Sequence, residues 1–371
     1  MTSGSGTEKK GRILSIDILR GYNMFWLIGG ADVIIALAAV FPCAVTQTLV
    51  EQVHHARGIG FHHHDLIFPL FLFLAGASWP FSLGSQLRKG VSRLGITLRA
   101  FRRFLLLAFL GAVMFGLLNL DFAHVRYNSI LGRIGFGWFV AAMGLLWCGR
   151  RRFPWYAAAW FFGYWAACLV LPHVFGPDGA TAWGKGCFQT IFDDWLGGRV
   201  PDKYGAEGFF QAVGCVSSAS LGVFAGLLLS KEGLSEGRRT LGLLGASALC
   251  GVGALVAWAT GCPCFKSIWS PTYILVAGTC SFAMLGVLHW IVDVKGFAKW
   301  AFFFKVIGMN AFTIYLLQWA WSFPMFGKKV FGGVASLLPT VWAALLLETG
   351  FVLLRWLVLL FLYRKKIFIR L

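Results

Sequence analysis

The sequence predicts an all-α, polytopic integral membrane protein with about ten transmembrane helices and both chain ends in the cytoplasm. Three observations lead to this prediction: the apolar composition, the length of the apolar runs, and the placement of basic residues between them. Of the 371 residues, 58% are hydrophobic and only 13% are charged, whereas soluble domains carry about 25% charged residues. Lipid is therefore the expected solvent for most of the chain.

Successive apolar runs are each long enough to cross a hydrocarbon core of about 30 Å as a helix rising about 1.5 Å per residue. Helices are expected because lipid cannot satisfy open backbone groups. The runs are 13–40, 66–87, 102–120, 129–148, 154–172, 208–230, 240–260, 272–292, 301–322 and 338–363. Only polar connections separate them, so we expect one transmembrane domain over residues 1–371.

Basic residues gather in every second connection, and the positive-inside rule places those connections in the cytoplasm. They are Lys9, Lys10 and Arg12; Arg88, Lys89, Arg93, Arg99, Arg102 and Arg103; Arg150, Arg151 and Arg152; Lys231, Arg238 and Arg239; Lys295, Lys299 and Lys305; and Arg364, Lys365, Lys366 and Arg370. The short tail 1–11 is then cytoplasmic, and the loops at 41–65 and 173–207 lie outside, the second being the longest. These loops explain the net charge of +18, so no nucleic-acid partner is expected.

Cysteine usage gives only a weak indication of disulfides. Most of the nine cysteines fall in or at the ends of apolar runs and are expected to be small buried hydrophobes. Cys187, Cys262 and Cys264 fall in outer loops, where a bridge can form. Cys262 and Cys264 are too close in sequence to bridge each other easily. We expect free thiols or a bridge to Cys187.

The first outer loop is rich in histidine. Five histidines and one aspartate occur within residues 54–65, next to an apolar run: His54, His55, His62, His63, His64 and Asp65. A metal site is one interpretation, but adjacent histidines point apart and no cysteine or second acid is near, so no metal is expected. A polar loop without chemistry is another. The third is that one histidine acts as an acid, a base or a nucleophile, with a carboxylate orienting its ring.

Polar residues inside the apolar runs are candidates for function because they are costly in lipid. Asp17 and Arg20 are spaced to pair on one helix face. They form either an anchoring ion pair or the mouth of a phosphate-binding site, since arginine suits phosphate geometry. Asn310 lies in another apolar run and needs a hydrogen-bond partner there. Its partner is either a neighbouring helix or a ligand.

Several motifs occur in order along most of the chain. They are Ser15-Ile16-Asp17-Ile18-Leu19-Arg20-Gly21; His55, ten residues before Asp65-Leu66-Ile67-Phe68-Pro69; Ile130-Leu131-Gly132-Arg133-Ile134-Gly135; Glu207-Gly208; Lys266 with Trp269-Ser270-Pro271-Thr272-Tyr273; and Gly308-Met309-Asn310-Ala311 with Tyr315. Together they resemble the heparan-α-glucosaminide N-acetyltransferase family and its bacterial relatives. Each motif alone is a weak signal, whereas the ordered set is specific.

The resemblance implies an acyltransferase that works across the membrane, with acetyl-CoA as donor and a glucosamine amine on the far side as acceptor. By motif position the family's catalytic histidine matches His55, and its following aspartate matches Asp65. The charge pattern independently places His55 outside. Asp65 would either orient the imidazole or cap the next helix. Candidate contacts to donor or acceptor are Arg20, Arg126, Arg133, Glu207, Lys266, Trp269, Ser270 and Asn310.

The sequence departs from the family pattern at a few positions. Gly132 replaces a glutamine, and Gly205-Ala206 replaces an aspartate-proline pair. Arg57-Gly58 stands where the family often has an acidic residue and a tryptophan. An arginine at the mouth of a pocket suits an acidic acceptor, so the acceptor here is expected to differ from that of the family.

We expect an acetyl-CoA-dependent acyltransferase of a bacterial inner membrane that modifies an amine or hydroxyl of an extracytoplasmic sugar or glycan. His55 would act as general base or as acyl acceptor, and the sequence does not separate the two. A homodimer is compatible with the sequence. The main rival is a proton-coupled transporter of a small anionic or sugar substrate, and the other is a structural protein of the envelope.

Overall fold

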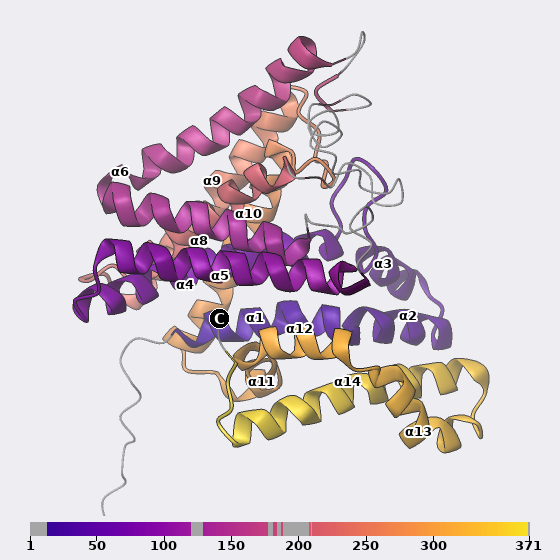
Figure 1. Cartoon of the computed structure of the whole chain (residues 1–371). Coiled ribbons are helices and arrows are strands. Elements are labelled where there is room, and N and C mark those ends of the chain that lie inside the picture. The colour runs from indigo at the N-terminus through magenta and orange to yellow at the C-terminus, as the bar shows by residue number, and fades with distance from the viewer. Residues whose placement is uncertain are drawn as a thin grey trace, which may run out of the picture.

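The computed structural model describes residues 13–119, 129–176, 181–183, 187, 208 and 210–369. These residues form helices together with one isolated β-bridge between Ile59 and Phe265. The α-helices in Figure 1 are α1 (Leu14–Phe25), α2 (Ala31–Val40), α3 (Ala44–Gln52), α4 (His63–Arg88), α5 (Arg93–Met114), α6 (Ile130–Phe175), α8 (Gln211–Leu229), α9 (Glu236–Ala259), α10 (Pro271–Leu288), α11 (Phe302–Met309), α12 (Ala311–Ala320), α13 (Phe323–Ala335) and α14 (Thr340–Arg364). The predicted all-α class is confirmed.

By length and composition, seven of the described helices can cross a membrane, or eight if the bent pair Lys299–Met309 and Ala311–Trp319 is one span. This supports an integral membrane protein. The count of ten and the orientation remain predictions. Most of one expected span, 102–120, falls in α5, which begins at Arg93, ends at Met114 and carries several arginines in its first half. Two others, 129–148 and 154–172, both fall within α6.

The long helix α6 is broken at Gly149, whose φ of 75° and ψ of 170° are not helical. The Tyr156 hydroxyl donates to the Val140 carbonyl at 2.9 Å. In a continuous helix these residues would lie about 24 Å apart along the axis, at about 1.5 Å per residue. The chain therefore turns back on itself inside α6, as Figure 1 shows.

Serine residues set the start of several helices. The side chains of Ser92, Ser129, Ser235 and Ser270 accept hydrogen bonds from the backbone N–H three residues later. Such N-caps satisfy donors that a helix cannot pair internally. They explain why α5 and α9 begin at Arg93 and Glu236, ahead of the apolar runs expected from residues 102 and 240.

The structure also contains short helices that the apolar runs did not predict. Within the outer loop expected at 41–65, Ala44–Gln52 is helical and His54 to His62 is not. Between the last two spans, Phe323–Ala335 forms α13 and packs on α14. The first span is interrupted by a π-helical turn, Trp26–Gly30 (η1). Hydropathy alone does not separate such breaks from a continuous helix.

The core is built around α4, which contacts α8 along much of its length. The two backbones approach so closely that a Cβ at Gly222 would overlap the carbonyl oxygen of Phe73. Small residues permit this kind of packing between membrane helices. The first turn of α4 is thereby held against the helical bundle, and it carries the aspartate predicted to be catalytic.

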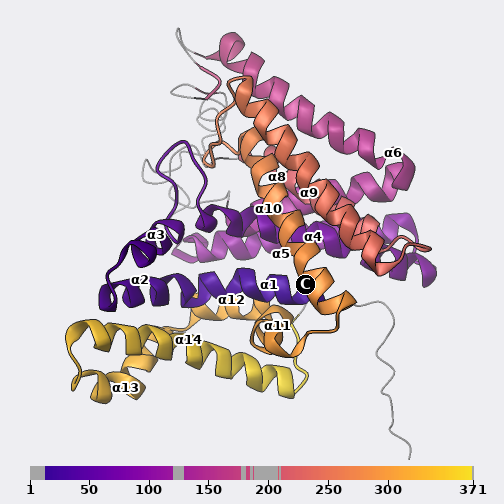
Figure 2. The ribbon, with the colours of Figure 1, turned by 180° about the vertical axis from the view of Figure 1, so that it is seen from behind.

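The loops fall at opposite ends of the bundle. The loop before α4 and the loop before α10 lie at the end where α3 is found, and the α4–α5 and α8–α9 connections lie at the other (Figures 1 and 2). Residues far apart in sequence are therefore brought together at the α3 end.

Candidate active site

The loop before α4 and the loop before α10 meet at the start of α4. The bridge between Ile59 and Phe265 joins them, and the N–H of Gly60 donates to the Cys264 carbonyl at 2.8 Å. Gly60 has a φ of 142°, a conformation that side chains disfavour. This junction brings Lys266 against His55 although 211 residues separate them in sequence.

Asp65 lies at the centre of the site and is only 1% exposed. Its Oδ1 accepts from His55 Nδ1 at 2.8 Å, while its Oδ2 accepts from the N–H of Ala56 at 3.1 Å and of His62 at 3.0 Å. The His62 contact is the capping interaction of α4. The two roles considered for Asp65 therefore coexist, with one oxygen orienting the imidazole and the other capping the helix.

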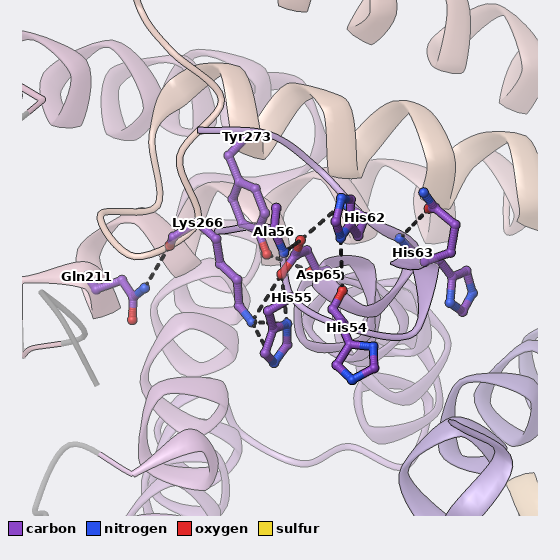
Figure 3. A network of polar contacts seen from close by, with 10 residues as sticks. His54, His55, Ala56, His62, His63, Asp65, Gln211, Lys266 and Tyr273 are labelled. Carbon is purple, nitrogen blue, oxygen red and sulfur yellow. Dashed lines mark hydrogen bonds and ion pairs between the residues drawn. The ribbon is translucent and has the colours of Figure 1, made fainter. Parts of the chain in front are cut away.

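His55 presents its imidazole at the surface of the protein, with its side chain 54% exposed. A carboxylate only accepts, so Nδ1 carries the proton given to Asp65, and in the neutral ring the lone pair is then at Nε2. Lys266 Nζ lies 2.9 Å from Nδ1 and 3.2 Å from Nε2. The ammonium therefore lies beside the ring and can donate only to Nε2 (Figure 3).

Opposite charges flank the imidazole. Lys266 Nζ is 3.3 Å from Asp65 Oδ1, and its side chain is 18% exposed. The carboxylate and the ammonium therefore hold the ring between them. A general base or a nucleophile needs a neutral imidazole whose Nε2 lone pair reaches the reacting group, so the ammonium has to leave Nε2 for either role.

The neighbouring thiols are less suited to this chemistry. Burial raises the pKa of Cys264 to about 12 and also raises the pKa of Cys262. Both thiols therefore stay protonated at neutral pH, and the thiolate is the reactive form. Cys262 and Cys264 are free thiols in the structure.

The segment after Lys266 anchors the lysine loop to the bundle. Ser270 accepts from the Tyr273 N–H at 3.2 Å and donates to the Pro263 carbonyl at 2.6 Å. Tyr273 donates from its hydroxyl to the backbone carbonyl of Asp65 at 2.7 Å. Trp269 is buried and donates to Ser218 at 3.1 Å. The structure thus places Trp269 and Ser270 below the loop that carries Lys266.

Gln211 was not singled out from the sequence. Its side-chain amide donates to the carbonyls of Lys266 and Ser267, both at 3.0 Å, and its oxygen accepts from buried Arg133. The Arg133 guanidinium lies 5.0 Å from the ring of Phe68. In the sequence, the feature that could have identified it is a glutamine at the start of an apolar run. Arg133 thus reaches the lysine loop through Gln211, from inside the bundle.

The other histidines of the loop face different partners. His54 Nδ1 donates to the Val50 carbonyl at 2.7 Å, and His62 Nδ1 donates to the His54 carbonyl at 3.1 Å. His63 contacts the Tyr22 hydroxyl at 2.9 Å, and the His64 ring lies 4.6 Å from that of His55. Within the part of the chain that the structure describes, no three His, Cys, Asp or Glu side chains are grouped to hold a metal ion.

Two of the predicted contact residues lie elsewhere, and two fall outside the described residues. Arg20 pairs with Asp17 at 3.0 Å and donates to Ser78 at 3.0 Å, both inside the bundle. Asn310 lies at the break between α11 and α12. Arg126 and Glu207 fall outside the described residues. Of the predicted site, the structure brings together His55, Asp65 and Lys266, with Trp269, Ser270 and Arg133 behind them.

Comparison with known proteins agrees with the resemblance carried by the motifs. The chain is 28% identical over 322 residues to the human heparan-alpha-glucosaminide N-acetyltransferase and 26% identical over 319 residues to the mouse protein. Each match covers 71% of this chain and 48% of the relative, so the chain spans about half the length of these relatives. No protein-family model matches the chain. The chain is a membrane protein that resembles the heparan-alpha-glucosaminide N-acetyltransferases.

Proposed function

We propose that the protein is a transmembrane acyltransferase. It moves an acetyl group from cytoplasmic acetyl-CoA to an amine or hydroxyl of an extracytoplasmic sugar or glycan, in a bacterial inner membrane. The observation that carries the proposal is the contact of His55 with Asp65 and Lys266 on an exposed loop of a helical membrane bundle. The resemblance to two N-acetyltransferases supports the reaction class.

The chemistry needs a base or nucleophile facing the acceptor. In one route, Nε2 of His55 takes the proton of the acceptor as its nitrogen or oxygen attacks the acetyl carbonyl carbon. In the other, Nε2 attacks that carbon first and later passes the acetyl group to the acceptor. In both routes the carbon–sulfur bond of the thioester breaks, and the proton lost by the acceptor ends on the CoA sulfur.

Lys266 is suited to the charge that develops in either route. Attack on the thioester carbonyl produces an oxyanion, and a preorganised hydrogen-bond donor stabilises it. A reacting group at Nε2 displaces the ammonium from that nitrogen and leaves it beside the carbonyl oxygen. Asp65 meanwhile holds the ring and favours its cationic form, as the carboxylate of a catalytic triad does.

The remaining predicted contacts belong to the same proposal. Arg20, held inside the bundle by Asp17 and Ser78, meets the phosphates of the donor. Arg126 and Glu207 contact donor or acceptor, as their motif positions imply. A homodimer is part of the proposal, to be tested by the mass of the purified protein in detergent.

The decisive experiment measures acetyl-CoA turnover by the purified protein and by His55→Ala, with glucosamine and a panel of amino and acidic sugars as acceptors. His54→Ala is the matched control, because His54 is an exposed neighbour that bonds only backbone. We expect CoA release by the wild type and His54→Ala and none by His55→Ala. Absence of both turnover and binding of acetyl-CoA by the wild type would remove the proposal.

A proton-coupled transporter is the second candidate. The observation favouring it is that the first span and the α11–α12 pair are both discontinuous, as are substrate-binding helices of many transporters. Reconstituted vesicles separate the two functions. A transporter accumulates its sugar or anion in response to a pH gradient without consuming acetyl-CoA.

A further inference from the structure

Two broken spans pack against each other in the middle of the bundle. The first is interrupted at Ile28 and Gly29, between α1 and α2. The second bends by 57° at Asn310, between α11 and α12. Ile28, Ala311 and Ile314 belong to one buried cluster. Both breaks therefore expose backbone polar groups to the same apolar interior, where each needs a partner.

The protein itself satisfies the first break. Arg355, from α14, donates from Nη1 to the freed carbonyl of Ile28 at 2.9 Å. The guanidinium stays close to Gly29, where an added Cβ would come within 3.0 Å of it. The backbone carbonyl at the break is thus hydrogen-bonded to a side chain of the protein. We therefore assign the first break a structural role only.

The second break has donors left over. Asn310 is 1% exposed, and its Nδ2 has no hydrogen-bond acceptor among the residues that the structure describes. Its Oδ1 lies 3.5 Å from the Thr313 hydroxyl. The first turn of α12 adds N–H groups that a helix cannot pair internally, and their partial charge is positive. Asn310 and this turn therefore form a set of donors facing the interior.

The surroundings define the kind of acceptor that fits. Ile307 and Ile314 are both fully buried beside Asn310, and an unsatisfied buried donor is costly. A free anion would itself be costly in such an apolar place. A neutral carbonyl oxygen would pair with the donors without bringing in a charge.

We propose that Asn310 and the start of α12 bind an amide carbonyl in the pantetheine arm of the acyl donor. The inference rests on the proposed function. A donor that enters from the cytoplasm and delivers its acetyl group to His55 must carry its amides through the bundle, where lipid offers no hydrogen bonds. The break lies about halfway along the bent pair Lys299–Met309 and Ala311–Trp319. It supplies donors at that depth.

The test measures binding to the purified, full-length protein, with acetyl-CoA and with adenosine 3′,5′-bisphosphate, which lacks the arm. The variants are Asn310→Leu, which removes the donor, and Asn310→Ser, which keeps a shorter one. Gln318→Leu on the same helix is the matched control. Thermal unfolding without ligand is recorded for each.

We expect Asn310→Leu to bind acetyl-CoA about tenfold more weakly, the effect of one hydrogen bond, and adenosine bisphosphate as the wild type does. Asn310→Ser should recover part of the loss, and Gln318→Leu should show none. Thermal stability should be equal or higher in Asn310→Leu, because removing an unpaired buried donor removes its cost.

Three results would overturn this inference and leave the proposed function unaffected. They are unchanged acetyl-CoA binding by Asn310→Leu, an equal loss for adenosine bisphosphate, and a loss of thermal stability without a loss of affinity. Failure of the wild type to bind acetyl-CoA is a different result. It would overturn the proposed function and this inference with it.

Discussion

The loop site and the break at Asn310 differ in whether their buried polar side chains have hydrogen-bond partners. At the loop site, buried Asp65 accepts from His55, Ala56 and His62 and lies near Lys266. At the break, buried Asn310 keeps an amide without an acceptor among the described residues. A satisfied network is rigid and preorganised, whereas unused donors in an apolar place suit a ligand. This difference is the basis for proposing chemistry at the first site and binding at the second.

The largest expected effect is that of removing the imidazole. His55→Ala should lower kcat/KM for acetyl transfer by about 10²–10⁴-fold, the range of a positioned base. The fold should survive, because the ring is exposed and Asp65 retains its backbone donors. Initial rates of CoA release check this, with His54→Ala as control. A variant that retains wild-type activity would assign the chemistry to another group.

The next effect concerns the charge that orients the ring. Asp65→Asn should reduce kcat roughly a hundredfold or more, as a neutral amide no longer favours the cationic imidazole. The KM for acetyl-CoA should change little, since Asp65 is buried below the ring. Steady-state kinetics separate the two parameters. A rise in KM at constant kcat would instead show a binding role.

Lys266 should have an intermediate effect. Lys266→Met removes the cationic donor beside the imidazole, so kcat for acetyl transfer should fall about tenfold as oxyanion stabilisation is lost. Lys266→Arg keeps a cationic donor at this place and should retain most of the activity. Initial rates of CoA release at saturating acetyl-CoA check both variants. An unchanged kcat in Lys266→Met would mean that the ammonium does not stabilise the oxyanion.

The smallest effect tests the acceptor. Arg57 is exposed and lies two residues after His55, so Arg57→Glu should weaken activity on acidic sugars up to about tenfold through a surface charge contact. Neutral amino sugars should be almost unaffected. The comparison is made at low and high salt, since screening should shrink the difference. An equal loss on both acceptor classes would remove the acidic-acceptor hypothesis.

The sequence predicted the helical class, and its motifs named three residues that lie together in the structure. Hydropathy shows where helices lie because lipid forbids other backbone arrangements, and the motif order selected His55, Asp65 and Lys266. The boundaries were less accurate, because serine caps such as Ser92 begin helices in polar sequence. The reversal at Gly149 and the bend at Asn310 depend on backbone angles, which hydropathy does not record.

The contact network of the site was predictable only in part. The spacing of His55 and Asp65 allows a pair, but the shared use of the two Asp65 oxygens follows from the capping geometry of α4. Gln211 was missed because one amide in an apolar run carries no pattern. Its role comes from a contact made 55 residues later in the chain, with the Lys266 carbonyl.

The junction of the two outer loops has a consequence for how the protein is made. Lys266 follows His55 by 211 residues, which a ribosome needs about 10–40 s to add at about 5–20 residues per second. During that interval the inserted half of the chain holds the histidine and its aspartate but lacks the lysine. In the proposed topology, the site is completed only when the loop that carries Lys266 has crossed the membrane and Ile59 has paired with Phe265. A nascent chain that ends before Lys266 therefore lacks the complete site, and catalysis on the proposed pathway begins only after α9 has been made.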